Sequence, residues 1–145
     1  MAHRVLPRVR MLFPCDDAVL RASDNKWVLT NPWAVVALPP GAHFPFDLQE
    51  MWLYAQLTDG VGESDLHVKM LLVQADDSRK AIHRGEPRRL EFPAGQQLQV
   101  FDTVFHMTNV PFDKPGVYEF QVWANYVELQ GQTAQIRVLD ARDKP

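Results

Sequence analysis

The residues near the N-terminus with the most reactive side chains are Cys15, Asp16 and Asp17, which follow one another in the chain. A thiol beside carboxylates suggests a nucleophile that is oriented by an acid. Such a nucleophile also needs a base within hydrogen-bonding distance, and negative neighbours raise the pKa of a thiol rather than lower it. We therefore predict that Cys15 is a small buried apolar side chain with no catalytic role and no disulfide, and that both aspartates shape the end of a strand.

Metal ligation is the second chemistry to test against the sequence. The histidines lie at positions 3, 43, 67, 83 and 106, and no two of them have the spacing of a ligand pair on a strand or a helix. Asp76 and Asp77 resemble part of an acidic calcium loop, but one aspartate pair supplies too few of the roughly six to eight oxygen ligands that calcium takes. We expect no metal and no other cofactor, and a tight turn at Asp76 and Asp77.

Basic residues concentrate between positions 79 and 89, in the segment SRKAIHRGEPRRLEF. A phosphate or nucleic-acid site is one interpretation, but Glu86 and Glu91 interrupt the segment, no aromatic stacking motif accompanies it, and the formal net charge of the chain is −3. Charges on a short, proline-broken strand are typical of a protected sheet edge. Glycine-rich phosphate loops, the nucleophile elbow and the zinc-binding His-Glu helix are absent. The sequence thus predicts neither nucleic-acid binding nor an enzyme, unless a site forms only in three dimensions.

The elements that position these residues are predicted to be strands throughout. Prolines interrupt the chain too often for long helices. Alternating segments recur about every ten residues with turn residues between them, which is typical of a sandwich or a barrel. The predicted strands span residues 8–14, 26–37, 50–57, 66–75, 81–91 in broken form, 98–107, 117–123 and 133–139.

Length and composition favour one ordinary domain. The chain has 145 residues, of which 46% are hydrophobic and 23% charged. We predict a single domain over residues 1–145, with a core from about residue 5 to 140 and a short frayed tail. No apolar run approaches the roughly 20 residues of a spanning helix, and a lone cysteine favours the cytoplasm. A cytoplasmic protein without membrane contact is therefore expected.

The most regular segment is the predicted hairpin that ends the chain. Tyr118, Phe120, Val122 and Ala124 fall on one face of the segment GVYEFQVWAN, and Ala134, Ile136 and Val138 do so in the return strand. These faces are expected to point into the core. The connection lies between Ala124 and Gly131, and either Asn125 or Gly131 is suited to the tight turn.

The segment DKPGVYEF, which opens this hairpin, resembles the start of strand F in immunoglobulin-like and fibronectin-like sandwiches. In those domains a tyrosine hydrogen-bonds back to the upstream backbone, a role that the resemblance gives to Tyr118. Phe120 stands where antibody domains have a cysteine, so the inter-sheet disulfide is not implied. The resemblance implies an antiparallel immunoglobulin- or fibronectin-like β-sandwich of about seven to nine strands.

A second resemblance covers most of the chain. It rests on CDD at residues 15–17, KWVLTNPWAVVALP at 26–39, GVGESDLHVKMLLVQADD at 60–77 and PFDKPGVYEFQVWANY at 111–126. Together these segments resemble a bacterial family of small, uncharacterised immunoglobulin-like β-sandwich proteins, a domain of unknown function. None of the segments is a catalytic signature, so the resemblance implies a fold and leaves the activity open.

The predicted strands 50–57 and 66–75 both place apolar side chains on the face opposite their aliphatic core residues. If residues 58–65 join them as an antiparallel hairpin, Trp52 lies near Leu71 and Tyr54 near Lys69. An outward cluster of this kind is unusual for a monomer, so it predicts a protein-contact face. A two-fold homodimer is one assembly that would cover such a face. The alternative is that residues 33–46 cover this face, or that a bulge shifts the register.

These observations predict a non-catalytic binding or assembly module that acts through an exposed sheet face, with a protein or a second copy as its partner. Two alternatives stay open. One is a small-ligand or carbohydrate module that uses the aromatic residues as a stacking platform. The other is an enzyme or metal site that forms only in the folded chain.

Overall fold

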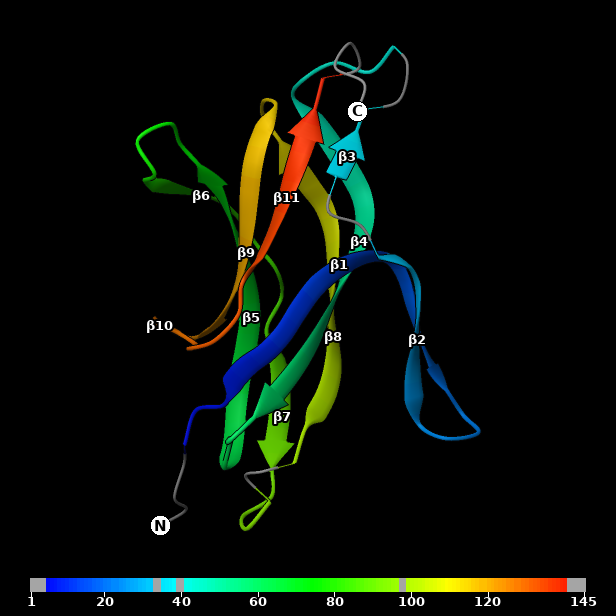
Figure 1. The fold of residues 1–145 in the computed structure, drawn as a ribbon, viewed down its shortest axis with the longest axis vertical. Helices are drawn as coiled ribbons and strands as arrows, with labels where there is room; N and C mark the ends of the chain where they lie inside the picture. Colours follow the sequence, from blue (N-terminus) through cyan, green and yellow to red (C-terminus); the bar gives the residue numbers. More distant parts are fainter. Residues whose placement is uncertain (1–4, 33–34, 39–40, 97–98, 141–145) are drawn as a thin grey trace.

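The computed structural model describes residues 5–32, 35–38, 41–96 and 99–140, and these form strands and their connections without a helix (Figure 1). The predicted all-β class is confirmed. Eleven strands are present in the described part of the chain, rather than about seven to nine: β1 (Arg8–Arg21), β2 (Lys26–Pro32), β3 (Val35–Ala37), β4 (Phe46–Thr58), β5 (Gly62–Val73), β6 (Arg79–Arg84), β7 (Arg88–Phe92), β8 (Phe101–Phe112), β9 (Gly116–Ala124), β10 (Val127–Glu128) and β11 (Ala134–Leu139).

The strands form two sheets. A four-stranded sheet has the order β2-β1-β4-β8, and a seven-stranded sheet has the order β3-β11-β9-β5-β6, with β7 paired to β5 and β10 paired to β9. Among the described residues, all strand pairs are antiparallel except β3 and β11, which run parallel. The expectation of purely antiparallel sheets is therefore wrong at this edge, because the chain enters β3 from the other sheet rather than from a hairpin.

One hydrophobic core receives side chains from both sheets. Met51, Leu53 and Leu57 of β4 and Leu66, Val68 and Met70 of β5 are fully buried and belong to the same cluster. Every second residue of these strands takes part, as the two-residue period of a β-strand requires. The alternation that identifies the strands in the sequence therefore also identifies the core.

The final hairpin is confirmed in pattern and in pairing. Tyr118, Phe120 and Ile136 are buried in the core, and β9 pairs antiparallel with β11. Both candidate turn residues adopt positive φ angles: Asn125 (φ 53°) turns the chain from β9 into β10, and Gly131 (φ 115°) lies on the way to β11. The chain thus uses both residues, and inserts the short strand β10 between them.

The pairing of β4 with β5 is a correction to the sequence interpretation. The edges of β4 are taken by β1 and β8, whereas β5 pairs with β9, β6 and β7. The chain therefore crosses from one sheet to the other after β4. A hairpin within one sheet and a pair of strands on facing sheets bury the same aliphatic stripes, so the alternation does not distinguish them.

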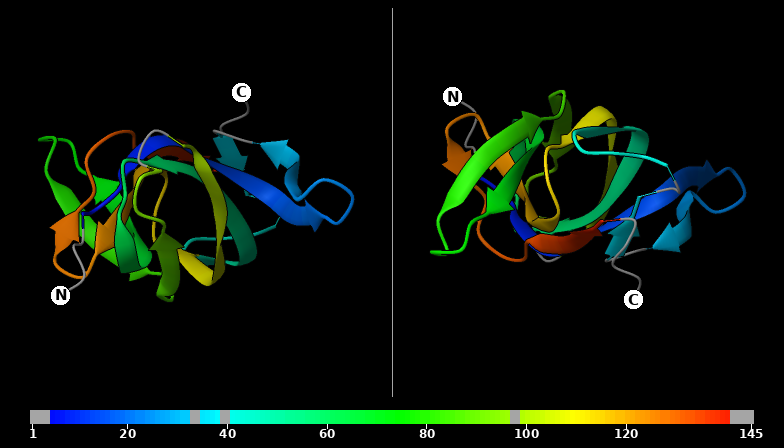
Figure 2. Two further views of the ribbon diagram at one scale, coloured as in Figure 1. Left: turned by 90° about the horizontal axis from the view of Figure 1, so that it is seen from below. Right: turned by 90° about the horizontal axis from the view of Figure 1, so that it is seen from above.

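The first strand is longer than predicted and has two different neighbours. Residues 8–15 of β1 pair with β4, and residues 15–21 pair with β2. Beyond Cys15 the two strands β1 and β2 therefore leave the sheet as a pair. We call residues 16–32 the arm, which projects from the body of the molecule in both views of Figure 2. The predicted strand 26–37 is divided into β2 and β3, with residues 33–34 outside the described part.

Candidate functional site

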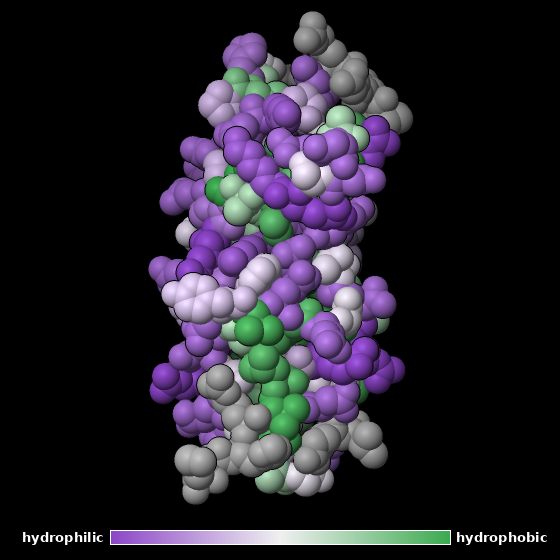
Figure 3. Space-filling view, turned by 90° about the vertical axis from the view of Figure 1, so that its left-hand side faces the viewer, coloured by the Kyte–Doolittle hydropathy of each residue, from purple (hydrophilic) through white to green (hydrophobic). Residues whose placement is uncertain are grey.

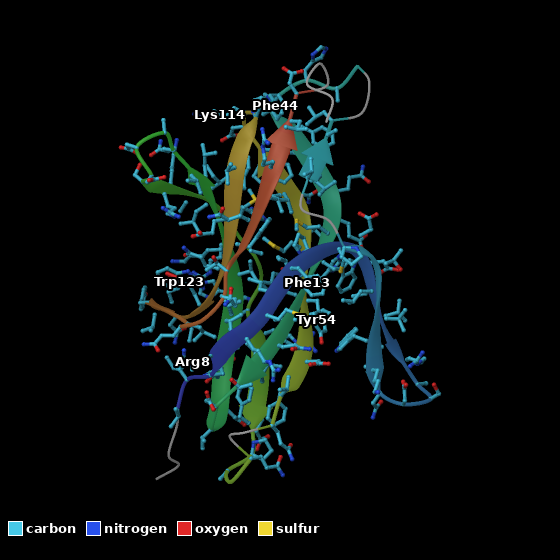
Figure 4. All side chains as sticks on the ribbon, in the orientation of Figure 1. Arg8, Phe13, Phe44, Tyr54, Lys114 and Trp123 are labelled. Carbon is cyan, nitrogen blue, oxygen red and sulfur yellow. The ribbon has the colours of Figure 1, made fainter. Side chains whose placement is uncertain are left out.

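Trp52 and Tyr54 lie on the outer side of the four-stranded sheet, as predicted from the alternation of β4. Tyr54 is only 7% exposed, since it belongs to a second apolar cluster with Cys15, Ala18 and Val104. The ring centroids of Tyr54 and Phe13 are 5.2 Å apart, and the two side chains lie side by side in Figure 4. The chain's own residues thus cover much of this face, and the covering side chains of β1 and the arm include Phe13, Ala18 and Trp27. Part of the alternative cover, residues 33–46, lies outside the described residues.

Trp52 is partly exposed and is held by two neighbours. Its indole stacks on the imidazole of His106 with centroids 4.0 Å apart and planes 16° apart. Glu50 Oε1 accepts a hydrogen bond from Trp52 Nε1 at 3.2 Å and lies 3.0 Å from His106 Nε2. One ring face of Trp52 is therefore covered by the imidazole, and a sugar could stack only on the other.

Cys15 lies under this outer face as a free, fully buried thiol, as predicted. Burial, with smaller contributions from Asp16 and Asp17, raises its pKa to about 11. The thiolate that a nucleophile or a metal ligand needs is therefore disfavoured near neutral pH.

Lys69 and Leu71 lie on the outer side of the other sheet. Leu71 is only 9% exposed, and the Lys69 ammonium lies 3.6 Å from the ring centroid of Trp123. A contact of this kind is worth about 0.5–1 kcal/mol at an exposed site. The interaction fixes the lysine against β9, on the left side of Figure 4 where Trp123 is labelled.

A hydrogen-bonded network continues along β9 on this outer side. The carboxylate of Glu119, which is buried, accepts hydrogen bonds from Gln121 at 2.6 Å, from Gln135 at 3.1 Å and from Arg79 at 3.4 Å, and Gln121 in turn accepts one from Trp123 at 2.9 Å. Burial acts to raise the pKa of Glu119, but the hydrogen bonds outweigh it and lower the pKa. The network pairs Glu119 and Gln121, the two polar side chains of β9 that are buried on this face.

The four residues of the predicted contact face therefore lie on two surfaces. Trp52 and Tyr54 belong to the outside of the four-stranded sheet, and Lys69 and Leu71 to the outside of the seven-stranded sheet. The single hairpin face that the sequence interpretation assumed is wrong, because β4 and β5 do not pair. One contact surface cannot contain all four side chains.

The arm carries apolar residues that sequence reasoning missed. Val19 and Val28 are paired across its strands and are 56% and 44% exposed. Leu20, which is 48% exposed, pairs with Trp27 and so belongs to the other face. On that face of the arm, Trp27 and Leu29 pack against the cluster that contains Tyr54. The signal in the sequence is the apolar run of Ala18, Val19 and Leu20, which directly follows Asp16 and Asp17, the residues predicted to lie at the end of a strand.

The basic segment lies on strands β6 and β7, and three of its arginines have partners. Arg79 pairs with Glu119, Arg89 with Asp65 at 3.0 Å, and Arg88 donates to the carbonyl oxygen of Val104 at 3.3 Å. These contacts support the interpretation of the basic segment as charged residues that protect a sheet edge. Asp76 accepts a hydrogen bond from the backbone N–H of Ser78 at 3.0 Å, and Asp77 has a φ angle of 67°, so the predicted turn is confirmed.

In the described part of the chain, no group of three or more His, Cys, Asp or Glu side chains is arranged to hold a metal ion. The same residues contain no helix that is long and apolar enough to cross a membrane.

The fold has distant structural similarities. An immunoglobulin-like protein from Pseudomonas aeruginosa is 12% identical with a TM-score of 0.45, over 93% of this chain and 98% of that chain. The alkylpurine DNA glycosylase AlkC from Pseudomonas fluorescens, bound to DNA with an abasic site analogue, is 14% identical with a TM-score of 0.43, over 91% of this chain but 30% of that chain. A β-glucosidase from Kluyveromyces marxianus is 12% identical with a TM-score of 0.35, over 68% of this chain and 14% of that chain.

No curated protein sequence matches the chain. A family model does match, over residues 10–138, and so covers the segments on which the sequence resemblance rests. The predicted membership in an uncharacterised family is therefore confirmed: the chain belongs to the family of unknown function DUF6941.

Proposed function

We propose that this protein is a non-catalytic binding module, built as an immunoglobulin-like sandwich, which takes up an extended segment of a protein partner along the arm. The observation that carries the proposal is the pair of exposed valines, Val19 and Val28, on an arm of only two strands. A hairpin of two strands is marginally stable in water on its own, and exposed apolar side chains on it favour a covering partner.

The free edge of β2 supports the choice of an extended segment as partner. β2 is the last strand of its sheet, so among the described residues no strand pairs with its outer edge. A strand that adds to such an edge gains backbone hydrogen bonds, and its alternate side chains cover the apolar face. The other face of the arm is held in place, because Trp27 and Leu29 pack against the apolar cluster that contains Tyr54.

The carbohydrate alternative has weaker support. A stacking platform needs flat, accessible rings, but Tyr54 is buried and His106 covers one face of Trp52. The proposal of a protein partner needs no such platform. A location in the cytoplasm, which the lone cysteine favours, stays a prediction.

The test compares two valines that are both exposed, one on the arm and one elsewhere. Purified wild type, Val28→Glu and Val100→Glu are used to capture proteins from cells of the source organism. We expect a partner that binds to wild type and to Val100→Glu but not to Val28→Glu, because a carboxylate on the arm is left without a counter-charge in an apolar contact.

The partner's binding segment is then synthesised, and amide hydrogen exchange is measured with and without it. Exchange should slow in β2, where the new strand pairs. A partner that binds equally well to Val28→Glu, or one that slows exchange only in other strands, would contradict the proposal.

A further inference from the structure

A groove of about 390 Å³ is lined by residues next to β1 and β10. In Figure 1, β10 and the segment that leads into β1 lie on the side of the molecule opposite β2 of the arm. One wall is the segment that leads into β1, with Leu6 and Pro7, and the other is the segment that leaves β10, with Val127 and Leu129. Arg8 stands on the first wall and Glu128 on the second. Figure 3, which shows the side on which β10 lies, has a continuous hydrophobic band through the lower half of this surface.

Backbone hydrogen bonds fix both walls of the groove. Val5 and Val61 exchange two hydrogen bonds of 2.9 and 3.0 Å. The N–H of Val9 donates to the carbonyl oxygen of Gln130 at 2.8 Å, and the N–H of Gln132 donates to the carbonyl oxygen of Val9 at 2.8 Å. The groove is thus formed before any partner arrives, which lowers the entropic loss on binding.

Tyr126 stands beside this groove and is 95% exposed. It occupies the tip of the two-residue connection between β9 and β10, where the positive φ angle of Asn125 makes the turn. The next residue, Val127, is 53% exposed and already belongs to the groove wall. A large aromatic side chain on a tight turn next to an apolar depression is the arrangement of a protein-contact anchor.

We infer that a second copy of this chain occupies the groove, with Tyr126 of each copy inserted into the groove of the other. Because the tyrosine and the groove lie side by side on one face, a two-fold axis brings both into contact at once and closes the assembly at two copies. Burial of a tyrosine removes about 150–250 Å² from water in each copy, well below the total of roughly 1,200–2,000 Å² in a stable interface. Val5, Val127 and the groove rim must supply the rest, so a reversible dimer is expected.

The charges on the groove rim also favour a second copy. Besides Asp59, two charged residues line the groove, Arg8 and Glu128, which are exposed and form no ion pair among the described residues. They have opposite signs and lie on opposite walls, so a two-fold arrangement places Arg8 of one copy toward Glu128 of the other. If positions 8 and 128 carried charges of the same sign, this two-fold arrangement would bring like charges together and would be disfavoured.

The first test measures the molar mass in solution over a concentration series by light scattering after size exclusion. Wild type and Tyr126→Phe should dimerise, because the phenylalanine keeps the ring. Tyr126→Ser should weaken the dimer by about 30-fold or more, the loss of an interface anchor. A wild type that is monomeric at every concentration, or a serine variant that dimerises as well as wild type, would overturn the inference.

The second test exchanges the two rim charges. Arg8→Glu and Glu128→Arg should each weaken dimerisation, and the double variant should restore it, since the pair is re-formed across the axis. A double variant as weak as the single ones would rule out the reciprocal arrangement. The arm variant Val28→Glu should dimerise like wild type, so the dimer and the binding function of the arm can fail independently.

Discussion

The hydroxyl of Tyr118 donates a hydrogen bond of 2.7 Å to the carbonyl oxygen of Lys114, which lies just before β9. The same hydroxyl oxygen is 3.4 Å from the Lys114 backbone N–H, and the Tyr118 ring meets Phe112 edge-on at 5.0 Å. Burial raises the pKa of Tyr118, so the neutral phenol is the donor. This contact, expected from the resemblance to strand F of immunoglobulin-like domains, ties the corner between β8 and β9 to the core.

Tyr118→Phe tests the energy of this corner. The variant keeps the buried ring and its contact with Phe112 but leaves the Lys114 carbonyl without its partner, so we expect a loss of about 0.5–1.5 kcal/mol in the free energy of unfolding. Urea denaturation measures the change. Tyr126→Phe, at an exposed hydroxyl, is the matched control and should unfold like wild type. Equal stability of both variants would show that the corner contributes nothing.

Phe120→Ala tests the register of the final hairpin. Phe120 is fully buried between the sheets, and its truncation should lower the free energy of unfolding by about 3–5 kcal/mol because a cavity remains. Thermal and chemical unfolding measure the loss. An exposed neighbour in β11, Gln135→Ala, removes hydrogen bonding on the outer face only and should lose less. A melt unchanged by Phe120→Ala would place this side chain outside the core.

The alternation of the sequence predicted which side chains point inward, and the structure confirms this for Tyr118, Phe120 and Ile136. A two-residue period depends only on the strand itself, so it can be recognised without knowledge of the neighbours. Which strands become neighbours cannot be recognised in this way. A hairpin and a pair of strands in different sheets both bury the aliphatic residues of β4 and β5. The sequence interpretation assumed the hairpin, which is wrong.

The candidate surfaces were predictable only in part. Trp52 was correctly placed on an outer face, but the arm that reaches over this face depends on where β1 changes partner, at Cys15. The groove is formed by segments more than a hundred residues apart, such as Leu6 and Leu129. No local pattern links these segments, and their contact follows from hydrogen bonds around Val9 and Gly131.

Gly131→Ala tests the close approach that builds the groove. Gly131 has a φ angle of 115°, and an added Cβ would lie 2.0 Å from the carbonyl oxygen of Val9, which is backbone and cannot turn away. We expect a loss of more than about 4 kcal/mol in the free energy of unfolding, or a protein that does not fold. Gly95→Ala is the control, since its φ angle is 82° but no atom lies within 4 Å, so only about 1–2 kcal/mol of backbone strain applies. Similar losses in both variants would show that the contact with Val9 is unimportant.

The pH dependence of stability tests the environment of His67. This side chain is buried, and within the described structure its Nε2 has no hydrogen-bond partner. Burial, followed by the charges of Arg84 and Lys69, lowers the pKa of His67 to about 4, whereas a histidine in an unfolded chain titrates near about 6.5. Below about pH 6.5 the unfolded chain therefore takes up a proton that the folded protein refuses, and stability falls until about pH 4.

Between pH 7 and pH 5, wild type should lose about 2 kcal/mol through this residue, a loss that His67→Gln cannot show because glutamine does not titrate. Urea denaturation at both pH values measures the difference for each protein. His43→Gln, at an exposed histidine, controls for the removal of an imidazole and should follow wild type. If His67→Gln loses as much stability as wild type over this range, then His67 is accessible to protons in the folded protein, and the packing of Trp123, Lys69 and Arg84 around it is looser than the structure indicates.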